Sequence, residues 1–394
     1  MNTSALNLQK AVIKKSAVQR RYDLDWLRVI AILILLYYHV GMIYVSWGWH
    51  IKHEQSSRLL EIVMVFLHQW RMPLLFTISG IGTYFALGFR SARQYSWERT
   101  KRLFFPVLFG MLVIVPPQIY LERLSRGENV GSYLHYYLRV YQFIPYPEGD
   151  FSWHHLWFVV YLFFYSLLLL PVFLYFRQSF GQKLIRRFAA FSAKPGGILY
   201  LLIPLLLVQW VLRPIFPQET HALTDDWANF AFNAFFFVFG YFLGDQPQIW
   251  ESLLRQRRIY LSATLLATLA MYVVYFTPAE KWMLPDLPLG FRYWWLVTMT
   301  LAWFSVVTSL AYGYKYLNRS HPWLKVLNEG IYPFYILHQT VIIIIGYQVL
   351  RWHWGIWLGF FFVSTASMLT CVGVYWLVIR PFNGMRFLFG MKGK

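Results

Sequence analysis

Long apolar stretches alternate with short charged segments along the whole chain. Nine uncharged runs each hold at least 18 residues, roughly the length that an α-helix needs to cross the hydrocarbon core of a bilayer. A tenth run, from Glu61 to Arg90, is interrupted only by Arg71. The pattern predicts an all-α, polytopic membrane protein with about ten transmembrane helices. The nine runs lie between Arg28 and Lys52, Arg102 and Glu122, Asp150 and Arg177, Lys194 and Arg213, Asp226 and Asp245, Arg258 and Glu280, Arg292 and Lys315, Glu329 and Arg351, and Arg351 and Arg380.

The charges between these runs predict how the helices are oriented. With a cytoplasmic N-terminus, the inner segments hold 26 of the 36 Lys and Arg residues but only 6 of the 17 Asp and Glu residues. The outer segments hold 9 basic and 11 acidic residues. This distribution follows the positive-inside rule, and it places both termini in the cytoplasm. We therefore expect a basic cytoplasmic segment at residues 1–22, a single transmembrane domain at 23–385 and a cytoplasmic tail at 386–394.

The net charge of +19 does not indicate a nucleic-acid-binding protein. The chain of 394 residues is 58% hydrophobic and only 13% charged, which is too few charges to cover a water-exposed globule. The basic residues set the topology and contact anionic lipids, and no basic stretch belongs to a nucleic-acid-binding fold. The glycines of GIGTYFALG in the second run indicate close helix packing rather than a nucleotide-binding loop.

Metal and disulfide chemistry are not expected. The single cysteine, Cys371, excludes an internal disulfide and any Cys-based zinc site, and it suits a small apolar packing position. The sequence also contains no HExxH zinc helix, P-loop or GxSxG elbow. Any catalysis must therefore rest on other polar groups of the apolar runs.

The first apolar run carries an aligned pair of such groups. Arg28 and His39 are eleven positions apart, almost three helical turns, so both project from nearly the same face about 16 Å apart. Arg28 lies near the predicted helix N-terminus, where the helix dipole disfavours a cation. Either a bound anion such as a phosphate or the carboxylate of Asp25, one turn earlier, must compensate. Asp25 is equally well explained as a cap of the helix.

Ionisable side chains inside a bilayer need a functional or a pairing explanation. His39 and Arg71 lie at similar depths, roughly 10 Å or more from the outer ends of the first two runs, which a short loop joins into an antiparallel pair. A neutral histidine can accept a proton from a hydroxyl, and a neighbouring arginine can hold an oxyanion. The alternative is a packing histidine beside a structural arginine. His68, one turn before Arg71, is either a second proton acceptor or an interfacial residue.

Further candidate residues lie in the outer loop and in the ninth run. His154 and His155, with Trp157, either bind a sugar face and its hydroxyls or anchor a helix at the interface. The tyrosine-rich outer loop at 122–154 suits the binding of a sugar or head group, and it equally suits an interfacial helix. His338 is either a site residue or part of an interhelical hydrogen bond.

Two of these segments resemble integral-membrane acyltransferase family 3. LDWLRVIAILILLYYH is similar to the opening of the family, in which an arginine is followed, after ten residues, by the catalytic histidine, here Arg28 and His39. RMPLLFTISG is similar to the family's Arg-x-x-x-Phe-Phe segment and the Ser-Gly that follows it. HHLWF and YPFYILHQ resemble later family segments. The second segment matches at Arg71, Phe76, Ser79 and Gly80, and Leu75 replaces the first Phe.

The resemblance implies an O-acyltransferase of the bacterial inner membrane, which moves an acetyl or succinyl group from cytoplasmic acyl-CoA to a hydroxyl of a periplasmic or cell-surface glycan. Our mechanistic hypothesis is that His39 is the base, that Arg71 stabilises the oxyanion or positions the acyl carbonyl, and that Arg28 with Asp25 holds the polar head of the donor. A covalent acyl-histidine relay is the other route. The LDWLR and RMPL segments are most similar to the glucan-modifying succinyltransferase type, which lacks an appended extracellular domain. Acceptor binding would fall to His68, His155, Trp157 and His338.

Two other functions compete with acyl transfer. A secondary transporter, or a flippase for a lipid-linked glycan or small anion, would also have ten helices and midplane ionisable groups, but it would often show related halves. We find no such repeat in the sequence. A membrane sensor or scaffold would not require Arg28, His39 and Arg71 to be aligned.

Overall fold

The structure, a computed structural model, describes residues 20–278 and 289–393. Nearly all of its regular structure is helical, and within these ranges the one β-type pairing is an isolated bridge between Pro145 and Phe151. The predicted all-α class is confirmed for the described part of the chain. The basic segment predicted at residues 1–22 lies, up to residue 19, outside the described residues.

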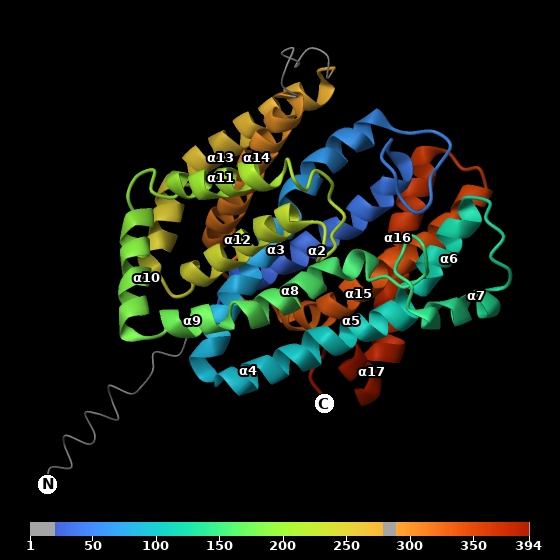
Figure 1. Cartoon of the computed structure of the whole chain (residues 1–394), viewed down its shortest axis with the longest axis horizontal. Helices are drawn as coiled ribbons and strands as arrows, with labels where there is room; N and C mark the ends of the chain where they lie inside the picture. Colours follow the sequence, from blue (N-terminus) through green and yellow to red (C-terminus); the bar gives the residue numbers. More distant parts are fainter. Residues whose placement is uncertain (1–19, 279–288, 394) are drawn as a thin grey trace, which may run out of the picture.

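The helices follow one another in a single series along the chain (Figure 1). The first half contains α2 (Tyr22–Gly41), α3 (Arg58–Phe89), α4 (Ala92–Arg99), α5 (Phe105–Phe109), α6 (Pro116–Ser125), α7 (Tyr133–Arg139), α8 (Trp157–Leu168), α9 (Leu170–Phe176) and α10 (Ser179–Ser192). The second half contains α11 (Leu202–Leu212), α12 (Trp227–Leu243), α13 (Pro247–Phe276), α14 (Leu289–Tyr316), α15 (Pro322–Arg351), α16 (Ile356–Val374) and α17 (Asn383–Leu388). Short 3-10 or π segments are η1 (Met42–Tyr44), η2 (Thr100–Phe104), η3 (Gly110–Ile114), η4 (Val140–Gln142), η5 (His154–Leu156), η6 (Leu199–Leu201) and η8 (Tyr375–Ile379).

Seven helical segments of the described chain are long and apolar enough to cross a membrane. Together, α8 and α9 make an eighth candidate, bent by 51° between Leu168 and Leu170. The two remaining predicted runs form shorter apolar helices, Leu199–Leu212 and Trp227–Leu243. Every predicted run thus contains a helix, but the count of ten crossings stays a prediction. The seven segments are Tyr22–Tyr44, Arg58–Phe89, Ala92–Ser125, Pro247–Phe276, Arg292–Tyr316, Pro322–Arg351 and Ile356–Ile379.

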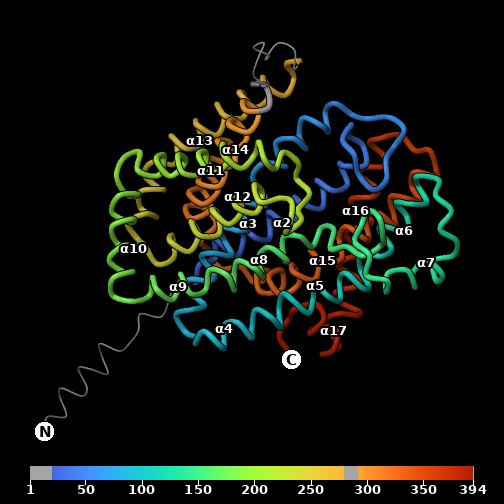
Figure 2. Tube along the Cα trace, in the orientation of Figure 1, coloured from blue at the N-terminus to red at the C-terminus, as the bar shows by residue number. Residues whose placement is uncertain are grey.

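Helices α2 and α3 form the centre of the bundle. Helix α2 packs against α3, α14, α15 and α16, and α3 packs against α12 and α14 (Figure 1). Beyond its charged first turns α2 is apolar except for Tyr37, Tyr38 and His39, and most of it is buried by the helices around it. Figure 2 shows α4, α9 and α17 along one edge of the molecule, opposite the loop that joins α2 to α3. We call these two edges the α4 side and the loop side.

Helices α3 and α12 approach each other at two glycines. A Cβ atom added at Gly80 would lie 2.0 Å from the carbonyl oxygen of Phe237, and one added at Gly240 would lie 2.0 Å from that of Thr77. Real Cβ atoms do not approach so closely, so only glycine allows the two backbones to meet here. The close packing predicted from GIGTYFALG is confirmed at Gly80, whereas Gly82 faces open space.

The described part of the predicted tail at residues 386–394 folds back onto the bundle. Arg386 in α17 is buried, and its guanidinium donates to Glu329 of α15 at 2.9 Å and to the carbonyl of Lys392 at 2.8 Å. This ion pair links α17 to α15. Residues near Arg386 therefore pack against the helical bundle, and the cytoplasmic location of this tail stays a prediction.

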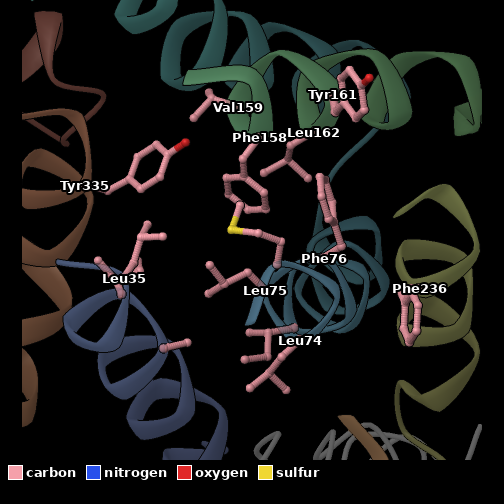
Figure 3. Packing of buried hydrophobic residues seen from close by; sticks show 14 of the residues in the cluster. Leu35, Leu74, Leu75, Phe76, Phe158, Val159, Tyr161, Leu162, Phe236 and Tyr335 are labelled. Atoms are coloured by element: carbon pink, nitrogen blue, oxygen red, sulfur yellow. The ribbon is translucent and has the colours of Figure 1, made fainter. Parts of the chain in front are cut away.

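An apolar layer crosses the middle of the bundle. Figure 3 shows Leu35 of α2, Leu75 of α3, Phe158 of α8 and Tyr335 of α15 pointing toward one another between these four helices. All four are buried. The layer separates two cavities, one toward each side of the molecule.

Candidate active site

The two cavities differ in size and in the charge of their walls. The cavity on the α4 side has a volume of about 690 Å³, and seven basic but only two acidic residues line it. The cavity on the loop side has a volume of about 160 Å³ and is lined mainly by aromatic, histidine and amide side chains. Tyr335 lines both cavities, so only a thin layer of side chains lies between them.

His39 lies in the wall of the loop-side cavity, and its hydrogen bonds define which ring nitrogen is free. His338 Nδ1 lies 2.5 Å from the carbonyl oxygen of Tyr335, which can only accept, so Nδ1 carries the proton of a neutral His338. His338 Nε2 is then an acceptor, and His39 Nδ1 donates to it at 2.8 Å. The neutral His39 ring therefore keeps an unprotonated Nε2 that can act as a base or a nucleophile.

Arg71 lines the same cavity and retains unused donor capacity. It is 5% exposed, its Cζ lies 3.4 Å from the ring centroid of Tyr38, and its Nη1 donates to the carbonyl of Leu67 at 2.9 Å. Its Nε is buried without a hydrogen-bond partner among the described residues. A buried guanidinium in this state can stabilise an anion or an oxyanion in the cavity.

His68 connects the helices to a loop that covers the cavity. Its Nδ1 lies 3.0 Å from the hydroxyl of Tyr38, and its Nε2 lies 3.3 Å from Glu219, which also pairs with Arg213 at 3.2 Å. Burial alone would raise the pKa of Glu219, but the hydrogen bond with His68 and the charges of His68 and Arg213 outweigh it and lower the pKa to about 2. Glu219 is therefore ionised at neutral pH, at the edge of the cavity.

The neighbouring residues His154 and His155 face different surroundings. His155 is buried, with Nε2 3.0 Å from the carbonyl oxygen of Ile336 and its ring at 5.3 Å from that of His338. Trp157 lines the loop-side cavity and stacks on His221 with ring centroids 4.2 Å apart. Burial lowers the pKa of His221 to about 4, so its ring is neutral at pH 7. The side chain of His154 lies outside this cavity, in a separate cluster with His50 and Glu122.

Arg28 lies at the α4-side cavity rather than beside His39. Its guanidinium lies 3.6 Å from Asp25, whose second oxygen accepts from Arg20 at 2.8 Å. Helix α2 begins at Tyr22, earlier than the predicted start, so Arg28 is almost two turns inside the helix. Asp25 lines only a smaller neighbouring cavity. The alignment predicted along α2 therefore places Arg28 at the α4-side cavity and His39 at the loop-side cavity.

The wall of the α4-side cavity favours an anionic ligand. Glu98 pairs with Arg90 and with Arg102, the latter at 3.6 Å, and Glu329 pairs with Arg386. The other basic residues outnumber these acids, which leaves a positive field in a cavity large enough for an extended group. The basic residues are Arg28, Arg90, Arg99, Arg102, Lys325, Arg386 and Lys392.

Several residues of the loop-side cavity were not predicted from the sequence. Tyr38 lies under Arg71 but is hidden in an apolar run beside His39. Glu219 and His221 belong to PQETHALTDD, a polar loop whose composition is a weak signal. Asn229 and Asn233 add amide groups one turn apart on α12. The packing of α12 against α3, and of α11 against α12, brings these groups to the cavity, and periodicity does not reveal such contacts.

The chain is similar to an acyltransferase domain family and to proteins named for glucan biosynthesis. The acyltransferase domain family matches residues 21–376, a range that contains every residue lining the loop-side cavity. "Glucans biosynthesis protein C" of Escherichia coli K12 is 23% identical over 354 residues, which is 87% of each chain. The protein of the same name from Salmonella typhi is 22% identical over 340 residues, 83% of each chain. No solved structure matches the chain.

Proposed function

Because this chain belongs to acyltransferase family 3, we propose that it is a membrane O-acyltransferase that moves an acetyl or succinyl group from cytoplasmic acyl-CoA to a hydroxyl of a periplasmic or cell-surface glycan. The observation that carries this proposal is the pairing of His39, with its free Nε2, and Arg71 in one cavity wall. The name of the similar E. coli protein, "Glucans biosynthesis protein C", supports a glucan as the acceptor.

The proposed topology has ten crossings of the bacterial inner membrane and cytoplasmic termini. The distribution of basic residues supports it, because Arg90, Arg99 and Arg102 cluster on the α4 side together with α17. The α4-side cavity then opens to the cytoplasm, where acyl-CoA is made. The loop-side cavity opens to the periplasm, where glycan hydroxyls are available.

The donor would enter through the basic cavity. Coenzyme A carries several phosphate oxyanions, and Arg28 with the neighbouring arginines can bind them as charge-assisted donors. The pantetheine arm is long and mostly apolar, so it can extend past Leu75 and Phe158, which line the inner end of this cavity. Movement of the layer around Tyr335 would then bring the thioester carbonyl to His39.

In the proposed reaction His39 Nε2 accepts the proton of an acceptor hydroxyl, while the oxygen of that hydroxyl attacks the thioester carbon. Arg71 stabilises the negative charge on the resulting oxyanion. The C–S bond then breaks, and the coenzyme A thiolate takes the proton from His39. In the covalent alternative, Nε2 itself attacks the thioester carbon, and the C–S bond breaks to release the coenzyme A thiolate. The acceptor hydroxyl then attacks the acyl carbon, the C–N bond breaks, and the hydroxyl proton passes to Nε2 and from there to the thiolate.

Mass spectrometry of cell-envelope glycans tests the proposal. Cells would express the wild type, His39→Ala, Arg71→Ala or an empty vector, with the membrane levels of the three proteins matched. The wild type should add an acyl mass to a glycan, and that mass identifies the acyl group, while His39→Ala should abolish it. Identical glycans in wild-type, His39→Ala and vector cells would contradict acyl transfer to these acceptors.

A further inference from the structure

Three potential metal ligands from separate segments meet on the loop side. His50 lies in the loop between α2 and α3, Glu122 in the last turns of α6, and His154 in η5. One ligand atom from each of these residues lies within 4.8 Å of the other two. None of the three lines the loop-side cavity or the α4-side cavity, and none takes part in the proposed acyl transfer.

The carboxylate of Glu122 is held in a fixed orientation. Its side chain is almost fully buried, and Oε1 accepts from the hydroxyl of Tyr146 at 2.6 Å and pairs with Arg126. Its second oxygen, Oε2, contacts Nδ1 of His50. Carboxylates that ligate a metal are usually held by hydrogen bonds, as Oε1 of Glu122 is here.

His154 supplies the observation that a ligand would explain. Its Nδ1 lies 2.8 Å from Ser152 Oγ, whereas its Nε2 is buried without a hydrogen-bond partner among the described residues. The ring lies 4.8 Å from that of His50, centroid to centroid. Its backbone has φ +38°, an unfavourable value for a residue with a side chain, so the fold holds this ring in place at a conformational cost.

We propose that His50, Glu122 and His154 bind a Zn²⁺ ion on the loop side of the protein. Two imidazoles and one carboxylate are a common zinc ligand set, and they leave a fourth position for water. A bound ion would set the three ligand atoms roughly 3.3 Å apart, so His50 Nδ1 and Glu122 Oε2 would have to separate from their present hydrogen-bond contact. The ion occupies the place of the proton between His50 and Glu122.

Zinc binding requires a defined change at His50. Its single ring proton moves from Nδ1 to Nε2, and Nδ1 then coordinates the ion. His50 Nε2 lies 3.0 Å from the side-chain amide of Gln339, whose oxygen accepts that proton once the amide is turned. A hydrogen bond of this kind orients most metal-bound histidines.

The ion would hold the loop-side wall of the candidate active site in position. Trp49, adjacent to His50, stacks on His39 with ring centroids 6.2 Å apart and planes at 16°. Without the ion, Gln339 donates to Gln118 at 3.0 Å and Gln118 reaches His155 at 3.3 Å, so turning the Gln339 amide toward zinc-bound His50 gives up its bond to Gln118. Zinc therefore acts at a distance from the reacting atoms, as a positioning ion.

Metal binding to the purified full-length protein tests this inference independently of acyl transfer. The protein would carry no oligohistidine tag, be stripped with EDTA in detergent and be dialysed against Zn²⁺ before the zinc content is measured by plasma mass spectrometry. We expect about one Zn²⁺ per wild-type chain and a loss of affinity of at least about tenfold in His50→Ala and in His154→Ala. His135→Ala, which removes an exposed histidine of the same outer loop, should bind as the wild type does.

Two further measurements keep the test decisive if an alanine variant fails to fold. Glu122→Gln preserves the shape of the side chain and should also lose zinc, as judged on protein that elutes as the wild type does in size-exclusion chromatography. Zn²⁺ should raise the melting temperature of the wild type and of His135→Ala, but not that of the ligand variants. The inference is wrong if the wild type holds no zinc, or if folded ligand variants bind it as tightly as the wild type.

Discussion

The carbonyl oxygen of Tyr335 fixes which ring nitrogen carries the proton, first in His338 and through it in His39. It accepts from His338 Nδ1, which makes His338 Nε2 an acceptor for His39 and leaves His39 Nε2 bare. His338→Leu removes that acceptor, so His39 should lose its fixed tautomer and kcat should fall by roughly 10²-fold or more. His338→Gln, whose amide oxygen can accept from His39, should recover much of the activity.

The measurement for His338 is the steady-state transfer of label from acyl-CoA to a soluble glucan by the purified variants. KM for the donor should be unchanged in both, because His338 lies away from the basic cavity. Equal activity of His338→Leu and His338→Gln would contradict a role in positioning the proton.

Arg71 should act in the transition state rather than in substrate binding. Arg71→Gln should lower kcat by roughly 10²- to 10³-fold, as expected for the loss of one oxyanion donor in a dry site. Arg71→Lys should restore little, because an ammonium cannot reproduce the planar guanidinium that packs over Tyr38. Michaelis–Menten analysis checks this, and a variant that changes only KM would contradict the role.

The sequence predicted the individual polar residues better than their partners. Arg28, His39 and Arg71 stand out because charged or ionisable groups are costly inside apolar helices. The sequence left open whether His338 is a site residue or an interhelical bond, and the structure places it 2.8 Å from His39, which is 299 positions away in the chain. Pairing across that separation depends on the packing of α15 against α2, which no local pattern encodes.

At the scale of elements, the contact between α3 and α12 should tolerate no side chain at Gly80. Gly80→Ala places a methyl group against the carbonyl of Phe237, and overpacking of this kind costs roughly 1–3 kcal/mol. The melting temperature in detergent should fall accordingly. Gly82→Ala, two residues along the same helix and facing open space, should leave it unchanged or slightly raised. Equal melting temperatures for both variants would contradict the tight contact.

Helix positions were predictable from charge spacing, whereas helix lengths and bends were not. Each uncharged run contains a helix because apolar residues without charges favour burial in lipid or protein. The run from Asp226 to Asp245 forms only α12, Trp227–Leu243, since Asp226 caps its start and Gly244 follows its end. The 51° bend between α8 and α9 falls near Pro171, but hydropathy alone gives no angle.

At the scale of the whole molecule, the charge asymmetry should govern donor binding. Arg99→Gln with Arg102→Gln should raise KM for acyl-CoA about tenfold or more, with kcat little changed, because the phosphates lose charge-assisted donors. The wild-type KM should itself rise with salt. Arg93→Gln, an exposed residue of α4 outside the cavity, is the matched control. An unchanged KM in the double variant would place the donor elsewhere.

The sequence predicted the distribution of charge between the two sides of the molecule, but not the cavity on the α4 side. The positive-inside pattern indicated which segments share a side, and the basic residues at the α4-side cavity follow it. The cavity itself depends on how α4, α15 and α17 enclose it, including the ion pair between Arg386 and Glu329. Such long-range packing leaves no trace in periodicity.

Transfer across a sealed membrane tests the central claim most directly. Proteoliposomes with one orientation of the protein would receive labelled acyl-CoA only on the α4 side and a glucan only on the loop side, with wild type and His39→Gln compared at equal protein content. The wild type should move label onto the glucan, and His39→Gln should reduce the rate by roughly 10²- to 10⁴-fold. Label on the glucan at the same rate in both, or transfer only when donor and glucan share one side, would contradict acyl transfer through His39 between the two cavities.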